Sequence, residues 1–287
     1  MNQEIAASYR YAETVARKRA RNFYYSFVVL PPAKRLAFCA VYAFMRYCDD
    51  ISDGTDSLED KRKQLKMWRA QLDAAVQGNL EGSPILPAFR DAVQRFSIPA
   101  EYFHWIIDGA EMDLVIDRYE TFDDLYRYCF HVASAVGLVC LQIFGYTDER
   151  AKKLAEQCGI AFQLTNILRD IKEDSGMGRV YLPAEDLRRF HITEDDLGGG
   201  TFDARFLELM MYETKRARQY YTQARSLLPL VDADSRPALW AMMAIYEGLL
   251  KKIIRRNYDV FGPAIRLSSA EKTAIALRAL AMRFLRL

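Results

Sequence analysis

Residues 159–174 read GIAFQLTNILRDIKED, and this stretch decides the fold class. Polar side chains recur in it every three or four positions, and the residues between them are largely apolar. The polar positions are Gln163, Asn166, Asp170 and Asp174. On a helix with 3.6 residues per turn they share one face with Gly159. A polar stripe on an otherwise apolar helix predicts a buried helix whose stripe lines a cavity.

Helical periodicity extends over most of the chain. Apolar residues follow helical spacing in eight ranges: 33–51, 61–77, 102–113, 122–144, 149–172, 202–228, 235–256 and 269–287. We find no alternating strand pattern bounded by hairpin turns. The breaks at 78–87, 175–183 and 198–200 are too short to be interdomain linkers. The sequence therefore predicts an all-α fold, with residues 1–287 forming a single domain.

Composition and charge exclude several function classes. The formal net charge of +2 is close to neutral, which gives no electrostatic case for nucleic-acid binding. Five cysteines are widely spaced without metal-ligand spacing, which predicts buried free thiols in a reducing compartment. The N-terminus has no apolar signal-peptide core, and we find no run long enough to cross a bilayer. We expect a cytoplasmic protein.

A second acidic helix face lies at residues 42–53, YAFMRYCDDISD. Asp49 and Asp53 are one helical turn apart and repel each other unless a positive charge lies between them. Tyr42 and Arg46 continue the same face inward. Carboxylate and amide oxygens are hard ligands of the kind Mg²⁺ prefers, so both acidic faces are candidate magnesium sites.

The spacing of the aspartates is weak evidence by itself. Chance would give about two pairs separated by four positions in a chain with this many aspartates. The chain holds four such pairs: Asp49/Asp53, Asp56/Asp60, Asp113/Asp117 and Asp170/Asp174. Two solvated helix faces are therefore an alternative interpretation. The first and last pairs differ from the others because their faces continue into apolar sequence.

Several blocks resemble, in order and spacing, the squalene/phytoene synthase family of head-to-head prenyltransferases. The blocks are Asn22–Phe27, Asp49–Asp53, Tyr128–Gly137, Asn166–Asp174 and Gly178–Pro183. The likeness covers nearly the whole chain. One departure is Ala20-Arg21-Asn22, which stands where the family usually has a small hydroxylated pair. Three further blocks resemble the bacterial presqualene-diphosphate and squalene synthases of hopanoid pathways: 23–31, 108–114 and 255–261.

The resemblance implies an isoprenoid-synthase-type helical bundle around a central cavity. It also implies head-to-head condensation of two farnesyl diphosphates to presqualene diphosphate and then squalene, by Mg²⁺-assisted loss of diphosphate. NADPH would be required if squalene is the product, and this fold class would not need a glycine-rich nucleotide fingerprint to bind it. Phytoene synthesis from geranylgeranyl diphosphate and dehydrosqualene synthesis without reductant are alternatives. From a different class, a non-catalytic prenyl-lipid binder would not need both acidic pairs.

The resemblance also assigns roles to individual residues. The implied metal ligands are Asp49, Asp53, Asn166, Asp170 and Asp174. The candidate diphosphate donors are Arg46, Arg169 and Arg179, because guanidinium groups bind phosphate oxygens bidentately. Aromatic faces that would stabilise a carbocation are expected from Phe23, Phe27, Tyr42 and Tyr128. The substrate-binding wall is expected to include Ala133, Val136, Gly137, Gly159, Gln163 and Tyr181. Surface salt bridges and ordinary helix packing are the alternative roles for the arginines and the small residues.

The last amphipathic stretch, 271–287, carries Arg278, Arg283 and Arg286. Such a basic amphipathic helix can lie on a membrane that receives a water-insoluble product, so peripheral membrane contact is a further expectation. Packing against the rest of the domain is the alternative.

Overall fold

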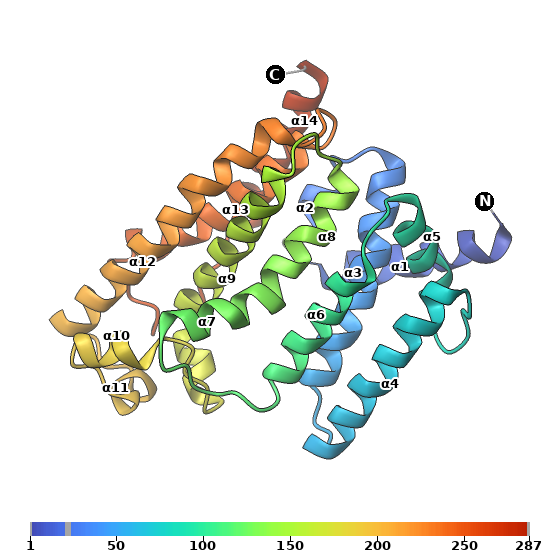
Figure 1. Cartoon of the computed structure of the whole chain (residues 1–287). Helices are drawn as coiled ribbons and strands as arrows, with labels where there is room; N and C mark the ends of the chain where they lie inside the picture. The colour runs from blue at the N-terminus through green and yellow to red at the C-terminus, as the bar shows by residue number, and fades with distance from the viewer. Residues whose placement is uncertain (1, 21–23, 286–287) are drawn as a thin grey trace.

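The computed structural model describes residues 2–20 and 24–285, and helix α9 (Arg150–Gly176) runs through its centre. Helix α9 contacts α8 (Ala135–Phe144), α12 (Ala204–Ala224) and α13 (Arg236–Arg255) (Figure 1). Across the described residues there is no β-strand, only the isolated bridges Arg118–Val180 and Tyr146–Val231. The predicted all-α fold is confirmed.

The remaining elements complete the bundle. They are α1 (Gln3–Arg19), α2 (Tyr24–Phe27), α3 (Pro32–Ser52), α4 (Leu58–Gln77), α5 (Leu86–Arg95), α6 (Ala100–Met112), α7 (Phe122–Cys129), the π-helix η1 (Phe130–Ser134), α10 (Ala184–Arg189), α11 (Glu194–Gly199), the 3₁₀ helix η2 (Arg225–Leu230) and α14 (Ser269–Leu285).

Sequence periodicity located the long helices and missed some others. Helix α1 was not expected because its buried face is made of Ser8, Tyr9, Ala12 and Ala16, which give little apolar signal. The start of α7 was expected, and its physical cause is a capping box. The Thr121 hydroxyl accepts from the amide of Asp124, and the Asp124 carboxylate accepts from the amide of Thr121.

The expected helix 122–144 is continuous, but its middle turn is η1. A π-helical turn inside an α-helix often marks a functional site. This segment corrects the expectation that no run could cross a membrane, because it is 23 residues long and contains an 18-residue window that is apolar enough by composition. Half of its most apolar window is buried inside the protein, and its inner face lines the cavity described below. Core packing accounts for its apolar character.

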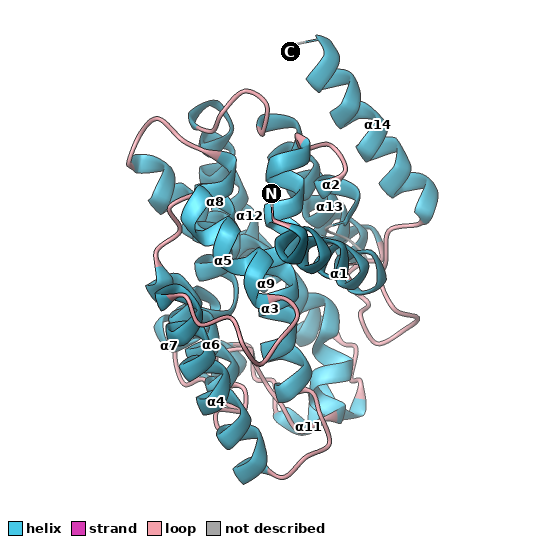
Figure 2. Cartoon of the chain, turned by 90° about the vertical axis from the view of Figure 1, so that its right-hand side faces the viewer, coloured by secondary structure: helices cyan, strands magenta, loops and turns pink. Residues whose placement is uncertain are grey.

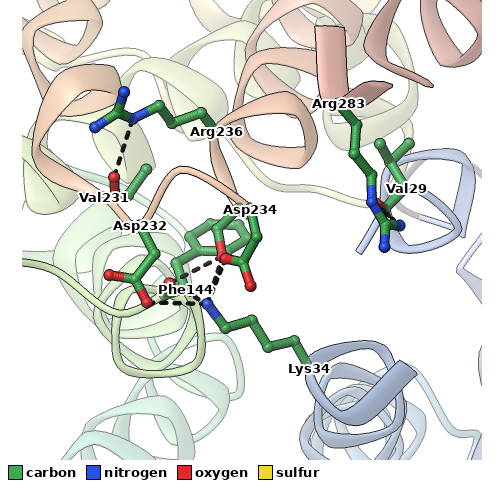
Figure 3. Close-up of polar contacts among 9 residues, drawn as sticks. Val29, Lys34, Phe144, Val231, Asp232, Asp234, Arg236 and Arg283 are labelled. Atoms are coloured by element: carbon green, nitrogen blue, oxygen red, sulfur yellow. Dashed lines mark hydrogen bonds and ion pairs between the residues drawn. The ribbon is translucent and has the colours of Figure 1, made fainter. Parts of the chain in front are cut away.

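Lys34 joins three helix ends on one side of the bundle. Its ammonium donates to the carbonyl of Phe144 at 2.8 Å, and to the carboxylates of Asp232 and Asp234 at 3.0 and 2.6 Å (Figure 3). These contacts hold the start of α3 against the end of α8 and the loop before α13. Lys34 is 13% exposed, so this cluster is better shielded from water than a typical surface salt bridge.

The expected free thiols are confirmed. All five cysteines are free; four are buried and Cys140 is half-buried.

Candidate active site

Helices α3, α6, α7, α8, α9 and α13, together with η1 and η2, enclose a cavity of about 370 Å³. Its mouth carries Arg46, Asp49, Asp53, Asp113 and Asn166. Its far end is apolar and is lined by Leu141, Phe144, Leu227, Leu239 and Met242. The α3 wall from Tyr42 to Asp53 spans about 16 Å at the rise of an α-helix. The cavity therefore suits a long apolar molecule with a charged head.

The first acidic pair and Arg46 form one charged cluster on α3. The Arg46 guanidinium lies 3.5 Å from Asp49 and 3.7 Å from Asp53. Its hydrogen bonds go to Asp50, from Nε at 2.8 Å and from Nη2 at 2.5 Å. Asp50 is thus the principal partner of Arg46, although helical spacing predicts that Asp50 points away from the line of Tyr42, Asp49 and Asp53. The predicted Tyr42, Arg46, Asp49 and Asp53 all line the cavity.

The carboxyl group of Asp49 carries unfavourable negative charge. The surrounding protein displaces solvent from it, and the charges of Asp53 and Asp113 add to this, so that its pKa rises from 3.8 to about 7 despite the opposing charge of Arg46. The side chain is still 57% exposed, because it lies at the open mouth of the cavity. Such a group gains stability from a cation that reaches it from solvent.

The second acidic pair lies beside the mouth and outside the cavity wall. The guanidinium of Arg169 donates through Nε to Asp170 at 2.7 Å, so both residues are engaged with each other. Asp174 lies near Arg179 and Tyr181 on a small adjoining pocket. Loss of solvation and the charge of Asp170 raise the pKa of Asp174 to about 7. Five predicted residues, Arg169, Asp170, Asp174, Arg179 and Tyr181, are therefore near the site without lining the cavity.

Asp113 connects the two acidic pairs. Its Oδ1 accepts from the hydroxyls of Tyr128 at 2.8 Å and Tyr181 at 3.1 Å, and its main-chain carbonyl accepts from Arg179 at 3.2 Å. Its charge raises the pKa of both Asp49 and Asp174. The sequence leaves two interpretations of Asp113 open, a contribution to the metal site or an exposed acidic turn, and in the structure Asp113 lines the cavity. The signal that could have found it is its place in the block 108–114, four positions before Asp117.

Replacing Asp113 with Asn is expected to lower kcat/KM by about 10- to 100-fold, because the carboxylate that accepts hydrogen bonds from Tyr128 and Tyr181 and attracts a cation to the mouth becomes a neutral amide. Stability is expected to stay equal or to rise, since burial disfavours the charged carboxylate and raises its pKa. Steady-state kinetics and thermal unfolding measure the two effects. Asp117→Asn is the matched control, because Asp117 is the other member of the Asp113/Asp117 pair but is 70% exposed. Equal turnover of the Asp113→Asn and Asp117→Asn variants would contradict a role for Asp113 in the active site.

The predicted aromatic residues separate into two groups. Tyr42 and Tyr128 line the cavity as expected. Phe27 does not, because it is buried in the core with its ring centroid 5.1 Å from that of Phe38 and 6.3 Å from that of Tyr42. Phe23 lies outside the described residues. Tyr246 lines the cavity and was missed; it hydrogen-bonds Asn166, whose amide donates to Gln163 at 3.3 Å.

The predicted small residues of the wall line the cavity, but Gly137 and Gly159 are required for close helix packing. Ala133, Val136, Gly137 and Gly159 are all in the wall. We expected Gly159 to leave room for a ligand. A Cβ on Gly159 would instead lie 2.6 Å from the Cα of Ser134, and one on Gly137 would lie 2.9 Å from the carbonyl of Ala155. Both glycines allow α9 to approach η1 and α8 closely.

The donor set at the mouth fits a divalent cation in its chemistry. The pKa values of Asp49 and Asp174 are both raised in part by the charge of Asp113, and a hard cation would relieve this repulsion. Within residues 2–20 and 24–285, no three His, Cys, Asp or Glu side chains converge on one point. Few protein ligands per ion are typical of Mg²⁺, which is completed by water and substrate phosphate.

Fold and site define an all-α enzyme with an apolar cavity and an acidic, arginine-bearing mouth. The chain belongs to the squalene/phytoene synthase family, whose model matches residues 16–271, and its members are prenyltransferases. A phytoene synthase of Mycobacterium tuberculosis is 39% identical over 97% of this chain and 92% of its own. A 15-cis-phytoene synthase of Synechococcus elongatus is 35% identical over 90% of this chain and 87% of its own.

Two solved structures are similar over nearly the whole fold. A dehydrosqualene synthase in complex with a ligand has a TM-score of 0.89 and 29% identity, covering 97% of both chains. A squalene synthase from Alicyclobacillus acidocaldarius has a TM-score of 0.85 and 27% identity, covering 90% of this chain and 97% of its own.

Proposed function

We propose that the protein joins two farnesyl diphosphates head to head to give presqualene diphosphate, and then squalene when a reductant is supplied. The observation that carries this proposal is the cavity, which is charged at one end and closed by bulky apolar side chains at the other. The charged end suits a diphosphate, and the closed end suits an isoprenoid tail of limited length.

The first step breaks the bond between C1 and the diphosphate oxygen of one substrate. The resulting allylic cation alkylates the C2=C3 double bond of the second substrate, which then loses a proton. Two farnesyl diphosphates thus give presqualene diphosphate, one diphosphate and one proton. Reduction by NADPH with loss of the second diphosphate would give squalene, and loss of a proton in place of reduction would give dehydrosqualene.

The charged residues act on the diphosphate. Mg²⁺ held by Asp49, Asp53, Asp170 and Asp174, with Asn166, would supply Lewis-acid neutralisation of the leaving group. Arg46 lies in the cavity wall, where its guanidinium can exchange a carboxylate partner for phosphate oxygens. Arg179 faces Asp113 and the charge of Asp53 from the other side of the mouth.

The uncharged residues act on the hydrocarbon and the proton. Tyr42 and Tyr128 present aromatic rings to the cavity, which stabilise positive charge without trapping it. The Tyr128 hydroxyl donates to Asp113 at 2.8 Å, and this carboxylate is our candidate acceptor of the released proton. Val136, Leu141 and Phe144 exclude water from the cation.

The second candidate function is phytoene synthesis from geranylgeranyl diphosphate. The specific observation in its favour is that the curated relatives at 39% and 35% identity are named phytoene synthases. The two candidates share the ionisation chemistry and differ in the length of the chain that the closed end admits.

Product analysis distinguishes them. Purified protein is incubated with Mg²⁺ and either farnesyl or geranylgeranyl diphosphate, with and without NADPH, and the extracted products are identified by mass spectrometry. We expect presqualene diphosphate from the C15 substrate without NADPH, and squalene with it. A C40 product with no C30 product would establish the second candidate. Absence of any condensed product, with prenyl diphosphate bound but intact, would instead indicate a binding protein.

A further inference from the structure

Helix α14 is held to the body of the protein by its charged residues. Lys252 on α13 donates to Glu271 at 2.6 Å. Figure 3 shows Arg283, which donates to the carbonyl of Val29 at 2.7 Å. Lys272 lies over the ring of Tyr25, and Arg278 lies over the ring of Trp240 at 4.9 Å. Every described charged side chain of α14 therefore contacts the body of the protein.

The opposite face of α14 is almost entirely apolar and exposed. The helix lies at the edge of the bundle (Figure 2), where it contacts α13 and α2. Six of its exposed residues recur at helical spacing on one stripe: Ala270, Thr273, Ala274, Leu277, Ala281 and Phe284. The exposed Arg278 lies at the border of this stripe. Leu277 is 61% exposed and Phe284 is 79% exposed. Large exposed apolar side chains on one helix face mark a binding surface.

The surroundings of this stripe are basic. Residues 236–285, which form α13, the following loop and α14, contain nine Lys and Arg against three Asp and Glu, a net charge of +6, whereas the whole chain carries +2. A groove of about 560 Å³ runs between α13, η2 and α14, and its charged lining is Arg225, Lys251, Arg278 and Glu247. Arg225 and Lys251 are about 60% exposed and share the single carboxylate of Glu247, at 3.0 and 3.6 Å, so positive charge remains in excess in the groove. The charge favours a negatively charged partner.

The groove also lies directly behind the closed end of the cavity. Three pairs of neighbouring residues form the shared wall: Leu227 and Leu228, Leu239 and Trp240, Met242 and Met243. The first of each pair lines the cavity, and the second lines the groove. The helices η2 and α13 thus separate the hydrocarbon end of the cavity from the groove beside α14.

We propose that the outer face of α14 docks on a lipid bilayer containing anionic headgroups, with Leu277 and Phe284 inserted and the basic residues around the groove facing the headgroups. An amphipathic helix lying in the interface uses this combination of apolar insertion and basic attraction. The closed end of the cavity then faces the membrane. Only this last consequence, delivery of an apolar product to the bilayer, rests on the proposed function.

The test is co-sedimentation of the full chain with vesicles of phosphatidylcholine alone or mixed with phosphatidylglycerol. The wild type is expected to bind the anionic vesicles, and added salt is expected to weaken binding. Leu277→Asp combined with Phe284→Asp should lower binding about tenfold or more, because both apolar contacts with the lipid are lost. Lys251→Gln should weaken binding to the anionic vesicles only. Met67→Asp on α4 is the matched control, since Met67 is 55% exposed on another helix.

Turnover in detergent, measured on the same variants, separates this proposal from the proposed function. All variants are expected to keep wild-type turnover there, since none of these residues lines the cavity. Vesicle binding by the double variant equal to that of the wild type would overturn the docking surface, whatever the product is. A wild-type dimer that the double variant dissociates, with no vesicle binding, would assign the face to a second copy and overturn it as well.

Discussion

Replacing Asp49 with Asn is expected to lower Mg²⁺-dependent turnover by about 10³-fold, which corresponds to ~4 kcal/mol of transition-state stabilisation. Asp49 lies in the cavity mouth 3.5 Å from Arg46, where the departing diphosphate must be neutralised. Asn keeps the size of the side chain and one oxygen but removes the charge. Steady-state kinetics over a range of Mg²⁺ concentrations is the measurement, and the apparent Mg²⁺ requirement should rise.

The direction in which Asp49→Asn changes the free energy of unfolding follows from the pKa of Asp49. The folded-state pKa of Asp49 is raised to about 7, above its ordinary value of 3.8. Above about pH 7 the folded protein holds a charge that it disfavours, so this group lowers stability as the pH rises between the two values. Asn removes that penalty, and thermal unfolding at about pH 8 should show equal or higher stability.

Asp56→Asn is the matched control for Asp49→Asn. Asp56 belongs to a pair with the same four-residue spacing, Asp56/Asp60, but it is exposed and accepts a hydrogen bond from Gln64 at 2.7 Å. Turnover of this control should equal that of the wild type. If Asp49→Asn retained full Mg²⁺-dependent turnover, the first acidic face would have no part in the chemistry.

Replacing Gly159 with Ala is expected to destabilise the protein by about 1–3 kcal/mol or more. The new Cβ would lie within 2.6–2.7 Å of the main chain of Ala133 and Ser134. Main-chain atoms cannot rotate away, so α9 and η1 must separate. The higher helix propensity of Ala favours the variant by only ~1 kcal/mol, so steric overlap decides the sign. Urea unfolding measures the loss, and turnover should fall as well because Gly159 lies in the cavity wall.

Gly176→Ala on the same helix is the matched control. A Cβ at Gly176 would meet no atom within 4 Å, so this change should be neutral or stabilising by up to ~1 kcal/mol. A Gly159→Ala variant as stable as the Gly176→Ala control would contradict the close approach of α9 to η1.

Helical periodicity was sufficient to predict the fold class and the long helices. Positions that face the core recur every 3.6 residues along a helix, so apolar residues recur at that spacing in the sequence. It could not reveal α1, whose buried stripe is mostly small residues. It also could not reveal η1, since a π-helical turn keeps the same apolar composition as the α-helix around it. The polar stripes on one face of α3 and α9 could be predicted because their residues also recur at helical spacing.

The sequence by itself determined the all-α class, the two acidic helix faces and, through ordered motifs, the family. Only the tertiary structure decided that Asp113 joins the two faces, that Arg46 binds Asp50 first, and that Phe27 packs behind the cavity wall. It also decided that Gly159 serves helix packing. The physical reason is that contacts between helices depend on how the helices cross. Asp113, Tyr128 and Tyr181 lie on separate segments, and nothing in their local sequence specifies that they meet.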